Sequence, residues 1–257
     1  MQALNIIDDL RNEAKAAAAQ YGIPADLHPE DQLLRHIHAK WGAVAGKKYF
    51  EGGHLDAVKI RQQILNLRHP KDRLKIMDFA AGFGRITRHL AHLMPEHDVM
   101  ASDIHPNACT FLQDTLNIRA FVSATDPAEL SIGDDYDVIF VMSLFSHLPD
   151  KSFGRWLGAL FERVAPGGFL FFTANGRVTL DTFPAFYGEI FPEGARYGFR
   201  AESDQHDLDS AEYGSMIISI RYGLDMIDQY APEAILQSYS SGGWLGTQDG
   251  WILKRPA

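Results

Sequence analysis

The chain has 257 residues, of which 46% are hydrophobic and 22% charged, so it can bury the core of one large α/β domain and is not a largely disordered chain. Its formal net charge of -9 disfavours nucleic acid as a partner, because wrapping a nucleic-acid backbone needs clustered Lys and Arg. The single cysteine, Cys109, fits a reducing compartment, and without a signal-peptide pattern or an apolar run of about 20 residues we expect a cytoplasmic protein that is not bound to membranes.

Residues 1–70 show helical periodicity. Apolar residues recur near helical spacing from Leu4 onward, and the same pattern returns in 31–40 and 55–67. The segment 49–53, which lies between these last two stretches and ends in two glycines, is expected to be a loop.

From Leu74 onward the pattern changes to short apolar runs that alternate with helical stretches. The runs are 74–79, 99–102, 120–122, 138–142 and 169–172. Continuous apolar strands separated by helices are typical of a parallel sheet that is covered on both faces. Two later runs, 234–240 and 250–254, flank a glycine-rich segment and favour a terminal hairpin.

The clearest functional signal is a strand, a glycine-containing turn and a helix start between Ile76 and Arg88. A turn that contains Gly82 and Gly84 lets a ligand lie against the backbone, and the free N–H groups of the following helix favour an anionic group. Asp103 lies 19 residues after Gly84, at the end of the next strand, where an acid can accept hydrogen bonds from both ribose hydroxyls of a nucleoside. The alternative role for this acid is a helix cap.

Two details of the turn favour S-adenosylmethionine (SAM) over a dinucleotide. The dinucleotide fingerprint places a glycine or an alanine three residues after Gly84, where this chain has Thr87. The acid of the first strand, Asp78, has no role in that fingerprint. A nicotinamide-dependent oxidoreductase is therefore the less favoured prediction.

The turn resembles the first motif of the class I SAM-dependent methyltransferases, an acid followed by three spaced glycines. The corresponding residues here are Asp78, Ala80, Gly82 and Gly84. Ala80 replaces the usual first glycine and keeps the turn small. Three more segments are similar to the second motif, the fourth strand and the fifth strand of that family, and they are Asp103-Ile104, 135–141 and 166–172.

The resemblance covers about residues 74–176, and 248–253 resemble the last, antiparallel strand of the family's fold. It implies a doubly wound, mostly parallel seven-stranded α/β sheet with an antiparallel C-terminal strand. We expect residues 1–70 to form an N-terminal helical cap on a SAM-binding domain of residues 71–257. An insertion or lid is expected at about residues 181–215, after the fifth strand.

The resemblance also implies cofactor contacts. Asp78 would order the turn, Asp103 would hold the ribose, and Ile104 would pack on the adenine. Ser123 and Asp126 follow the third strand and are the candidates for reading the adenine amine. Asp126 can equally cap the segment that follows it.

The segment 49–53 is similar to one that closes over the methionine end of SAM in related bacterial enzymes. Tyr49 and Gly53 are therefore cofactor candidates. The alternative is a plain inter-helix loop with a buried aromatic residue.

The loop 142–149 follows the fourth strand, at the end of the sheet where open α/β folds bind ligands. Ser143 is a further cofactor candidate in this loop. His147 is a candidate general base, because an imidazole titrates near neutral pH, and its alternative role is a hydrogen bond to the loop backbone.

The region 181–215 combines aromatic and charged residues that suit an enclosing pocket for an organic molecule. The candidate substrate residues are Phe186, Tyr187, His206 and Tyr213. The alternative is a hairpin or lid with its own small core. Because the 11 histidines are scattered without a pattern of metal ligands, we expect no metal.

Together these features predict an enzyme that transfers a methyl group from SAM to an O, N or C atom of a small organic molecule, with S-adenosylhomocysteine (SAH) as the product. The sulfonium is already activated, so the protein mainly has to position and desolvate the reactants. The alternative of another class is a SAM-binding regulatory or assembly protein without catalysis. An aminopropyltransferase is disfavoured, because 143–147 contain no acid that could bind a polyamine.

Overall fold

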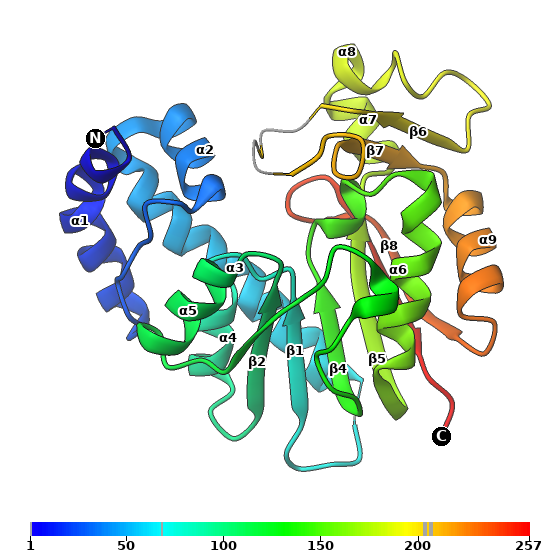
Figure 1. Ribbon diagram of the computed structural model, residues 1–257, viewed down its shortest axis with the longest axis horizontal. Coiled ribbons are helices and arrows are strands. Elements are labelled where there is room, and N and C mark those ends of the chain that lie inside the picture. The colour runs from blue at the N-terminus through cyan, green and yellow to red at the C-terminus, as the bar shows by residue number, and fades with distance from the viewer. Residues whose placement is uncertain (1, 68, 203–204, 206–207) are drawn as a thin grey trace. The chain divides into compact units, whose positions relative to one another are not determined.

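The computed structural model describes residues 2–67, 69–202, 205 and 208–257 (Figure 1). The chain divides into two compact units, residues 1–123 and residues 124–257. The boundary expected at residue 70, between a helical cap and the main domain, stays a prediction. Within the described ranges, the helices are too short or too polar to span a membrane.

The N-terminal part of the first unit is helical, as predicted. Its helices are α1 (Gln2–Tyr21), α2 (Gln32–Trp41), the short 3-10 helix η1 (Gly42–Val44) and α3 (Ala45–Asn66). Their apolar faces meet in one buried cluster that includes Leu10, Leu34 and Phe50. Asp31 fixes the start of α2, because its Oδ1 accepts a hydrogen bond from the Leu34 N–H at 3.0 Å.

The loop predicted at residues 49–53 is wrong, because α3 runs through this segment without a break. Gly53 serves a close contact instead of a turn. A Cβ on this residue would lie 2.4 Å from the carbonyl oxygen of Arg85, so only glycine lets α3 approach the chain there.

Three parallel strands of the first unit follow the order β3-β2-β1. The elements are β1 (Lys75–Phe79), α4 (Thr87–Leu93), β2 (Asp98–Asp103), α5 (Pro106–Asp114) and β3 (Ala120–Val122). β1 and β2 are buried over most of their length, which accounts for their continuous apolar sequence.

The second unit holds four more strands, in the order β4-β5-β9-β8. They are β4 (Tyr136–Val141), β5 (Val164–Ala174), β8 (Ile235–Trp244) and β9 (Gln248–Lys254). β4 and β5 are parallel, and β9 is antiparallel to both β5 and β8. The remaining elements of this sheet region are η2 (Pro127–Glu129), η3 (Leu144–Ser146), α6 (Asp150–Glu162) and α9 (Ile220–Tyr230).

The seven strands belong to one sheet in the order β3-β2-β1-β4-β5-β9-β8. Its members are parallel except for β9, which confirms the predicted fold class. The terminal hairpin is also confirmed, although β8 continues to Trp244, beyond the predicted end of that strand.

The chain between β5 and α9 forms a small substructure where the insertion was expected. It contains α7 (Arg177–Thr182), α8 (Pro184–Tyr187) and a separate antiparallel sheet of β6 (Tyr197–Arg200) and β7 (Ser215–Ile218). β7 contacts both η3 and β5. The substructure therefore lies near the carboxyl end of β5, drawn at the top of Figure 1.

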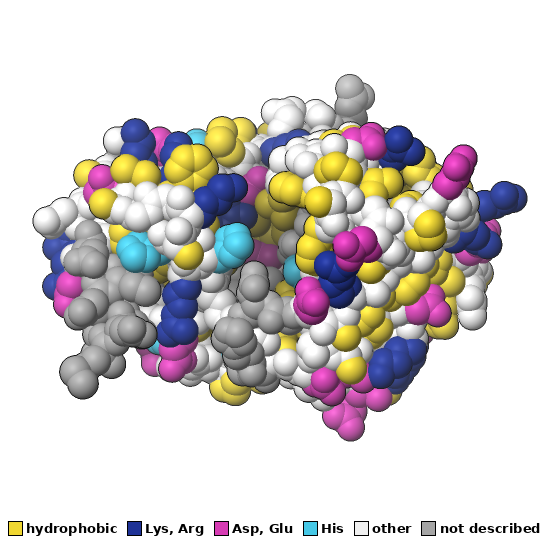
Figure 2. Space-filling view, turned by 90° about the horizontal axis from the view of Figure 1, so that it is seen from above, with side chains coloured by type: hydrophobic (Ala, Val, Ile, Leu, Met, Phe, Trp, Pro, Cys, Tyr) yellow, Lys and Arg dark blue, Asp and Glu magenta, His cyan; other side chains and the backbone are white. Residues whose placement is uncertain are grey.

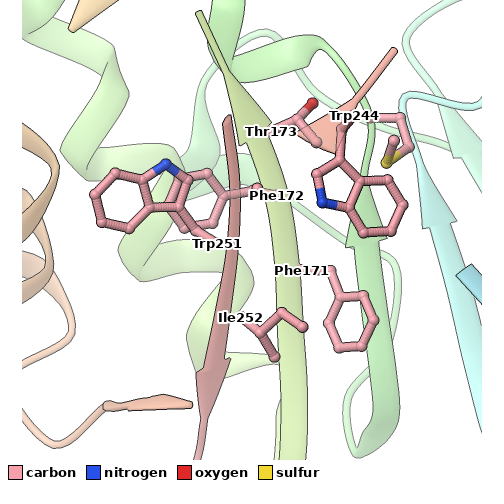
Figure 3. Close-up of a pocket in the computed structure, with 8 residues that line it drawn as sticks. Phe171, Phe172, Thr173, Trp244, Trp251 and Ile252 are labelled. Atoms are coloured by element: carbon pink, nitrogen blue, oxygen red, sulfur yellow. The ribbon is translucent and has the colours of Figure 1, made fainter. Parts of the chain in front are cut away.

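The core of the second unit packs on both sides of β5 and β9 (Figure 3). Phe172 stacks on Trp251 with ring centroids 5.8 Å apart, and Phe171 and Trp244 lie on the opposite side of the two strands. The cavity beside Trp244 measures about 10 Å³, which is room for one water molecule and no substrate.

Candidate functional site

The turn after β1 is organised around a buried acid. Asp78 is 2% exposed, and its Oδ2 accepts a hydrogen bond from the Thr87 hydroxyl at 2.5 Å. The pKa of Asp78 is raised to about 7, chiefly by burial and in part by the nearby Asp103, while the hydrogen bond from Thr87 opposes the shift. The acid is thus poised to lose a proton when a cation approaches.

The backbone of the turn is left-handed at three alternate positions. The φ angles are 62° at Ala80, 55° at Gly82 and 76° at Gly84. Glycine adopts this conformation without cost, whereas alanine is strained, which explains the physical preference for three glycines in the motif. Ala80 therefore retains the turn at a cost in backbone strain.

Gly82 and Gly84 differ in what surrounds them. A Cβ on Gly84 would lie 2.6 Å from Cδ2 of Leu112, so this glycine lets the turn pack against α5. A Cβ on Gly82 would meet no atom within 4 Å. The open space at Gly82 is where a ligand can lie against the backbone.

Asp103 ties the end of β2 to the same turn. Its Oδ2 accepts a hydrogen bond from the Gly82 N–H at 2.7 Å, and its Oδ1 accepts one from the His105 N–H at 3.0 Å. The Nδ1 of His105 also lies 2.8 Å from Oδ1, so of about four lone-pair sites on the carboxylate at least one remains for a ribose hydroxyl. The bond to His105 shows that Asp103 also orders the start of α5, and the half-buried Ile104 lies between the two.

Two residues of this region were not identified as important from the sequence. Thr87 is fully buried, and its hydroxyl donates a hydrogen bond to Asp78. Arg88 is 2% exposed, and its guanidinium donates hydrogen bonds to backbone carbonyls. The Arg88 guanidinium donates to Phe83 O at 3.0 Å and to Asp26 O at 2.7 Å, and its Nε donates to Gly84 O at 3.0 Å. The available signal was the presence of polar residues at helix positions that face inward, directly after the glycine turn.

Tyr49 and Gly53 lie on α3 and serve packing in this structure. The Tyr49 hydroxyl donates to Oδ2 of Asp31 at 2.7 Å, and its ring is 1% exposed. Burial raises the pKa of Asp31, and this bond from Tyr49 opposes the effect. The contact of Tyr49 and Gly53 with a cofactor stays a prediction.

The two candidates for adenine recognition have backbone or capping partners. The Ser123 N–H donates to Asp103 O at 2.8 Å, which extends the pairing of β3 with β2. Asp126 caps η2 by accepting from the Ala128 N–H at 2.9 Å, and it also pairs with Arg155. The capping alternative for Asp126 is therefore confirmed, while adenine recognition stays a prediction.

His147 follows η3 and makes a two-way backbone connection. Its Nδ1 lies 2.7 Å from Gly214 O, and the Gly214 N–H donates to His147 O at 2.8 Å. The ring also stacks on Tyr213, with centroids 4.4 Å apart. Because a carbonyl accepts the bond, neutral His147 carries its proton on Nδ1 and has its basic lone pair on Nε2.

The other substrate candidates lie near the carboxyl end of β5. The Tyr187 hydroxyl accepts a hydrogen bond from Nδ2 of the buried Asn175 at 3.0 Å. The Phe186 ring lies 4.5 Å below the guanidinium of Arg200, which pairs with Glu189. His206 lies outside the described residues. Among the residues that are described, no three His, Cys, Asp or Glu side chains gather as metal ligands do.

The sheet order and the glycine-containing turn after β1 are those of a Rossmann-like domain. Residues 76–168 match the family model of the methyltransferase domain. A segment of 104 residues of this chain is 31% identical to an uncharacterised protein of Synechococcus. The segment makes up 38% of this chain and 24% of that protein.

Solved structures with the same fold include several methyltransferases, two of which contain SAM or SAH. Magnesium protoporphyrin IX methyltransferase of Synechocystis, solved with bound SAH, has a TM-score of 0.56 at 15% identity, over 88% of this chain and 93% of that chain. A SAM-bound amino pentose methyltransferase of Micromonospora echinaspora has a TM-score of 0.54 at 14% identity, over 79% of this chain and 91% of that chain. At this identity the two structures show the fold.

The family match supports a methyltransferase domain at residues 76–168, and the fold is the one found in the two SAM-dependent methyltransferases named above. Both findings support the family, the enzyme class and the cofactor that the sequence predicted.

Proposed function

We propose that the protein transfers a methyl group from SAM to an O, N or C atom of a small organic molecule by direct in-line displacement. The observation that carries the proposal is the left-handed turn of Ala80, Gly82 and Gly84, with the Gly82 N–H held on Asp103. The turn leaves backbone open to a ligand beside an acid with unused acceptor capacity. This arrangement suits the amino-acid end and the ribose of SAM.

The cofactor roles follow from the chemistry of the residues. Asp78 balances the positive charge of SAM, Asp103 accepts the ribose hydroxyls, and Ile104 packs on the adenine. The two catalytic requirements are alignment of the acceptor atom with the methyl group and exclusion of water. Neither requires an invariant catalytic residue.

The acceptor is proposed to be small. The fold neighbours named above act, by their names, on a porphyrin and an amino pentose. On the face shown in Figure 2, Lys and Arg side chains alternate with acidic and apolar ones and form no continuous basic stripe among the described residues. A polyanionic acceptor is therefore disfavoured. His147, whose Nδ1 proton is fixed by Gly214, is the proposed base for acceptors that must lose a proton.

The first test is calorimetric titration with SAM, SAH and NAD in parallel. We expect micromolar binding of SAM and SAH and none of NAD. NAD binding alone, or no binding, would contradict the proposal. SAM binding without SAH formation across a broad panel of acceptors would favour the regulatory alternative.

Two matched glycine variants locate the cofactor. Both variants add the same left-handed backbone strain, but Gly82→Ala places its methyl group in open space, so it should weaken SAM binding at least tenfold without disturbing side-chain packing. Gly84→Ala places the same methyl group against Leu112, so it should mainly lower the melting temperature. Asp103→Ala should abolish SAM binding, whereas the exposed Asp114→Ala should leave it unchanged. Normal affinity in folded Asp103→Ala would remove the ribose assignment.

A further inference from the structure

A buried polar network connects the loop after β4 with β5 and β9. The Ser143 N–H donates to Thr173 Oγ1 at 2.8 Å, and the Thr173 hydroxyl donates to Gln248 Oε1 at 2.7 Å. Gln248 Nε2 lies 3.0 Å from Ser143 Oγ and 3.2 Å from Ser146 Oγ. Ser146, Thr173 and Gln248 are each less than one-tenth exposed, so these bonds replace contacts with water.

The direction of each hydrogen follows from the donors present. Thr173 donates to Gln248, which fixes the amide orientation, so both amide hydrogens are directed to Ser143 Oγ and Ser146 Oγ. The Ser146 hydroxyl donates to the Ser143 carbonyl. Only the Ser143 hydroxyl hydrogen keeps a choice: it can rest on Ser146 Oγ, 3.0 Å away, or turn to a ligand without breaking another bond of the network.

The network also holds an unfavourable backbone. Ser143 has a φ angle of 69°, in the left-handed region that a serine rarely occupies. Such a conformation persists where the surroundings determine it, and it is concentrated at functional sites. Here the surroundings are the Thr173 and Gln248 side chains, which fix Ser143 through its amide and its hydroxyl.

The position of the loop indicates a role for the network in ligand binding. Ser143 and Ser146 lie at the carboxyl end of β4, the end at which open α/β sheets bind their ligands. Three residues on from η3's start, the same loop reaches His147 and its two bonds with Gly214. A substitution of Gln248 should therefore alter the conformation of the whole loop from Ser143 to His147.

We propose that Gln248 is a positioning residue for the cofactor: it sets the strained loop so that the Ser143 hydroxyl donates a hydrogen bond to an oxygen of bound SAM. The inference rests on the proposed function. Gln248 itself acts through Ser143 and Ser146. The antiparallel strand β9 thus contributes to binding as well as to the sheet.

The experiment compares SAM affinity, by calorimetry, in Gln248→Leu, Gln248→Glu, Ser143→Ala and the double variant Ser143→Ala/Gln248→Leu. Gln237→Ala, an exposed glutamine on β8, is the matched control. Gln248→Glu keeps the size of the side chain, but its carboxylate can only accept hydrogen bonds. The Ser143 hydroxyl hydrogen would then point to this carboxylate and no longer to a ligand. The Gln248→Glu variant also keeps the test possible if Gln248→Leu does not fold.

We expect each single variant to weaken SAM binding about tenfold and the double variant to be no weaker than the worse single one, because both changes remove the same hydrogen bond. Amide exchange of residues 143–148 should accelerate in Gln248→Leu and not in Gln237→Ala. Additive effects, or unchanged affinity in folded Gln248 variants, would overturn the inference while leaving the proposed function intact. Absence of SAM binding by the unaltered protein would overturn both.

Discussion

Two buried titratable groups of the first unit should oppose each other in the dependence of stability on pH. His89 on α4 is 1% exposed, and neither ring nitrogen has a hydrogen-bond partner among the described residues. The pKa of His89 is lowered to about 3, chiefly by burial and in part by the neighbouring His54 and Arg88. Burial raises the pKa of Asp78 to about 7. Their unfolded values are about 6.5 and 3.9.

The signs of the two effects are opposite. Between about pH 4 and pH 6 the unfolded chain holds a proton on His89 that the folded protein lacks, so stability falls by about 1.4 kcal/mol for each unit of acidification. Over the same range the folded protein holds a proton on Asp78 that the unfolded chain lacks, so stability rises by about the same amount as the pH falls. The two contributions cancel in the unaltered protein.

Single variants should show separately the two opposing pH dependences of the unfolding free energy. Relative to the unaltered protein, Asp78→Asn should lose about 3 kcal/mol of unfolding free energy between pH 6 and pH 4, and His89→Phe should gain about 3 kcal/mol. Urea denaturation at about pH 4, 5 and 6 measures both, and the double variant should parallel the unaltered protein. Curves of either single variant that run parallel to the unaltered protein would refute the reasoning.

Three further predictions concern the turn after β1 and the residues that support it. Because the deprotonated Asp78 is the form that attracts a cation, SAM affinity measured by calorimetry should rise as the pH rises through about 7, and Asp78→Asn should flatten this dependence. Ala80→Gly should raise the unfolding free energy by up to about 1 kcal/mol by releasing left-handed strain, whereas Ala81→Gly should lower it; the opposite order in thermal unfolding would contradict the strain. Arg88→Met should cost about 2–4 kcal/mol, because it leaves buried carbonyls without donors, and the exposed Arg221→Met should cost almost nothing in the same assay.

The periodic parts of the chain could be predicted from sequence, and the reasons are local. Strands β1, β2, β4 and β5 are apolar because they are buried over most of their length, and the turn after β1 carries glycines because its φ angles are positive. The error at 49–53 arose because glycine serves turns and close contacts alike. At Gly53 the distinguishing fact is an oxygen of Arg85, which lies 32 residues further along the chain.

The supporting residues of the site could not be predicted, because their partners are distant in sequence. Thr87, Arg88 and Gln248 each occupy an ordinary position in a helix or strand pattern. Their roles depend on which backbone or hydroxyl groups the fold brings to them. Gln248 is separated from Ser143 by 105 residues, and no local pattern records that contact.

The order of the strands has a consequence for biosynthesis. β9 lies between β5 and β8, yet it follows both in the chain, so the ribosome makes the central member of this trio last. The 105 residues from Ser143 to Gln248 take about 5–20 s to translate at typical rates. Throughout that interval the nascent loop after β4 lacks its hydrogen bonds from Gln248, and a chain interrupted before Gln248 cannot form them. The hydrogen-bond network of this loop is therefore complete only after the strand that completes the sheet has emerged.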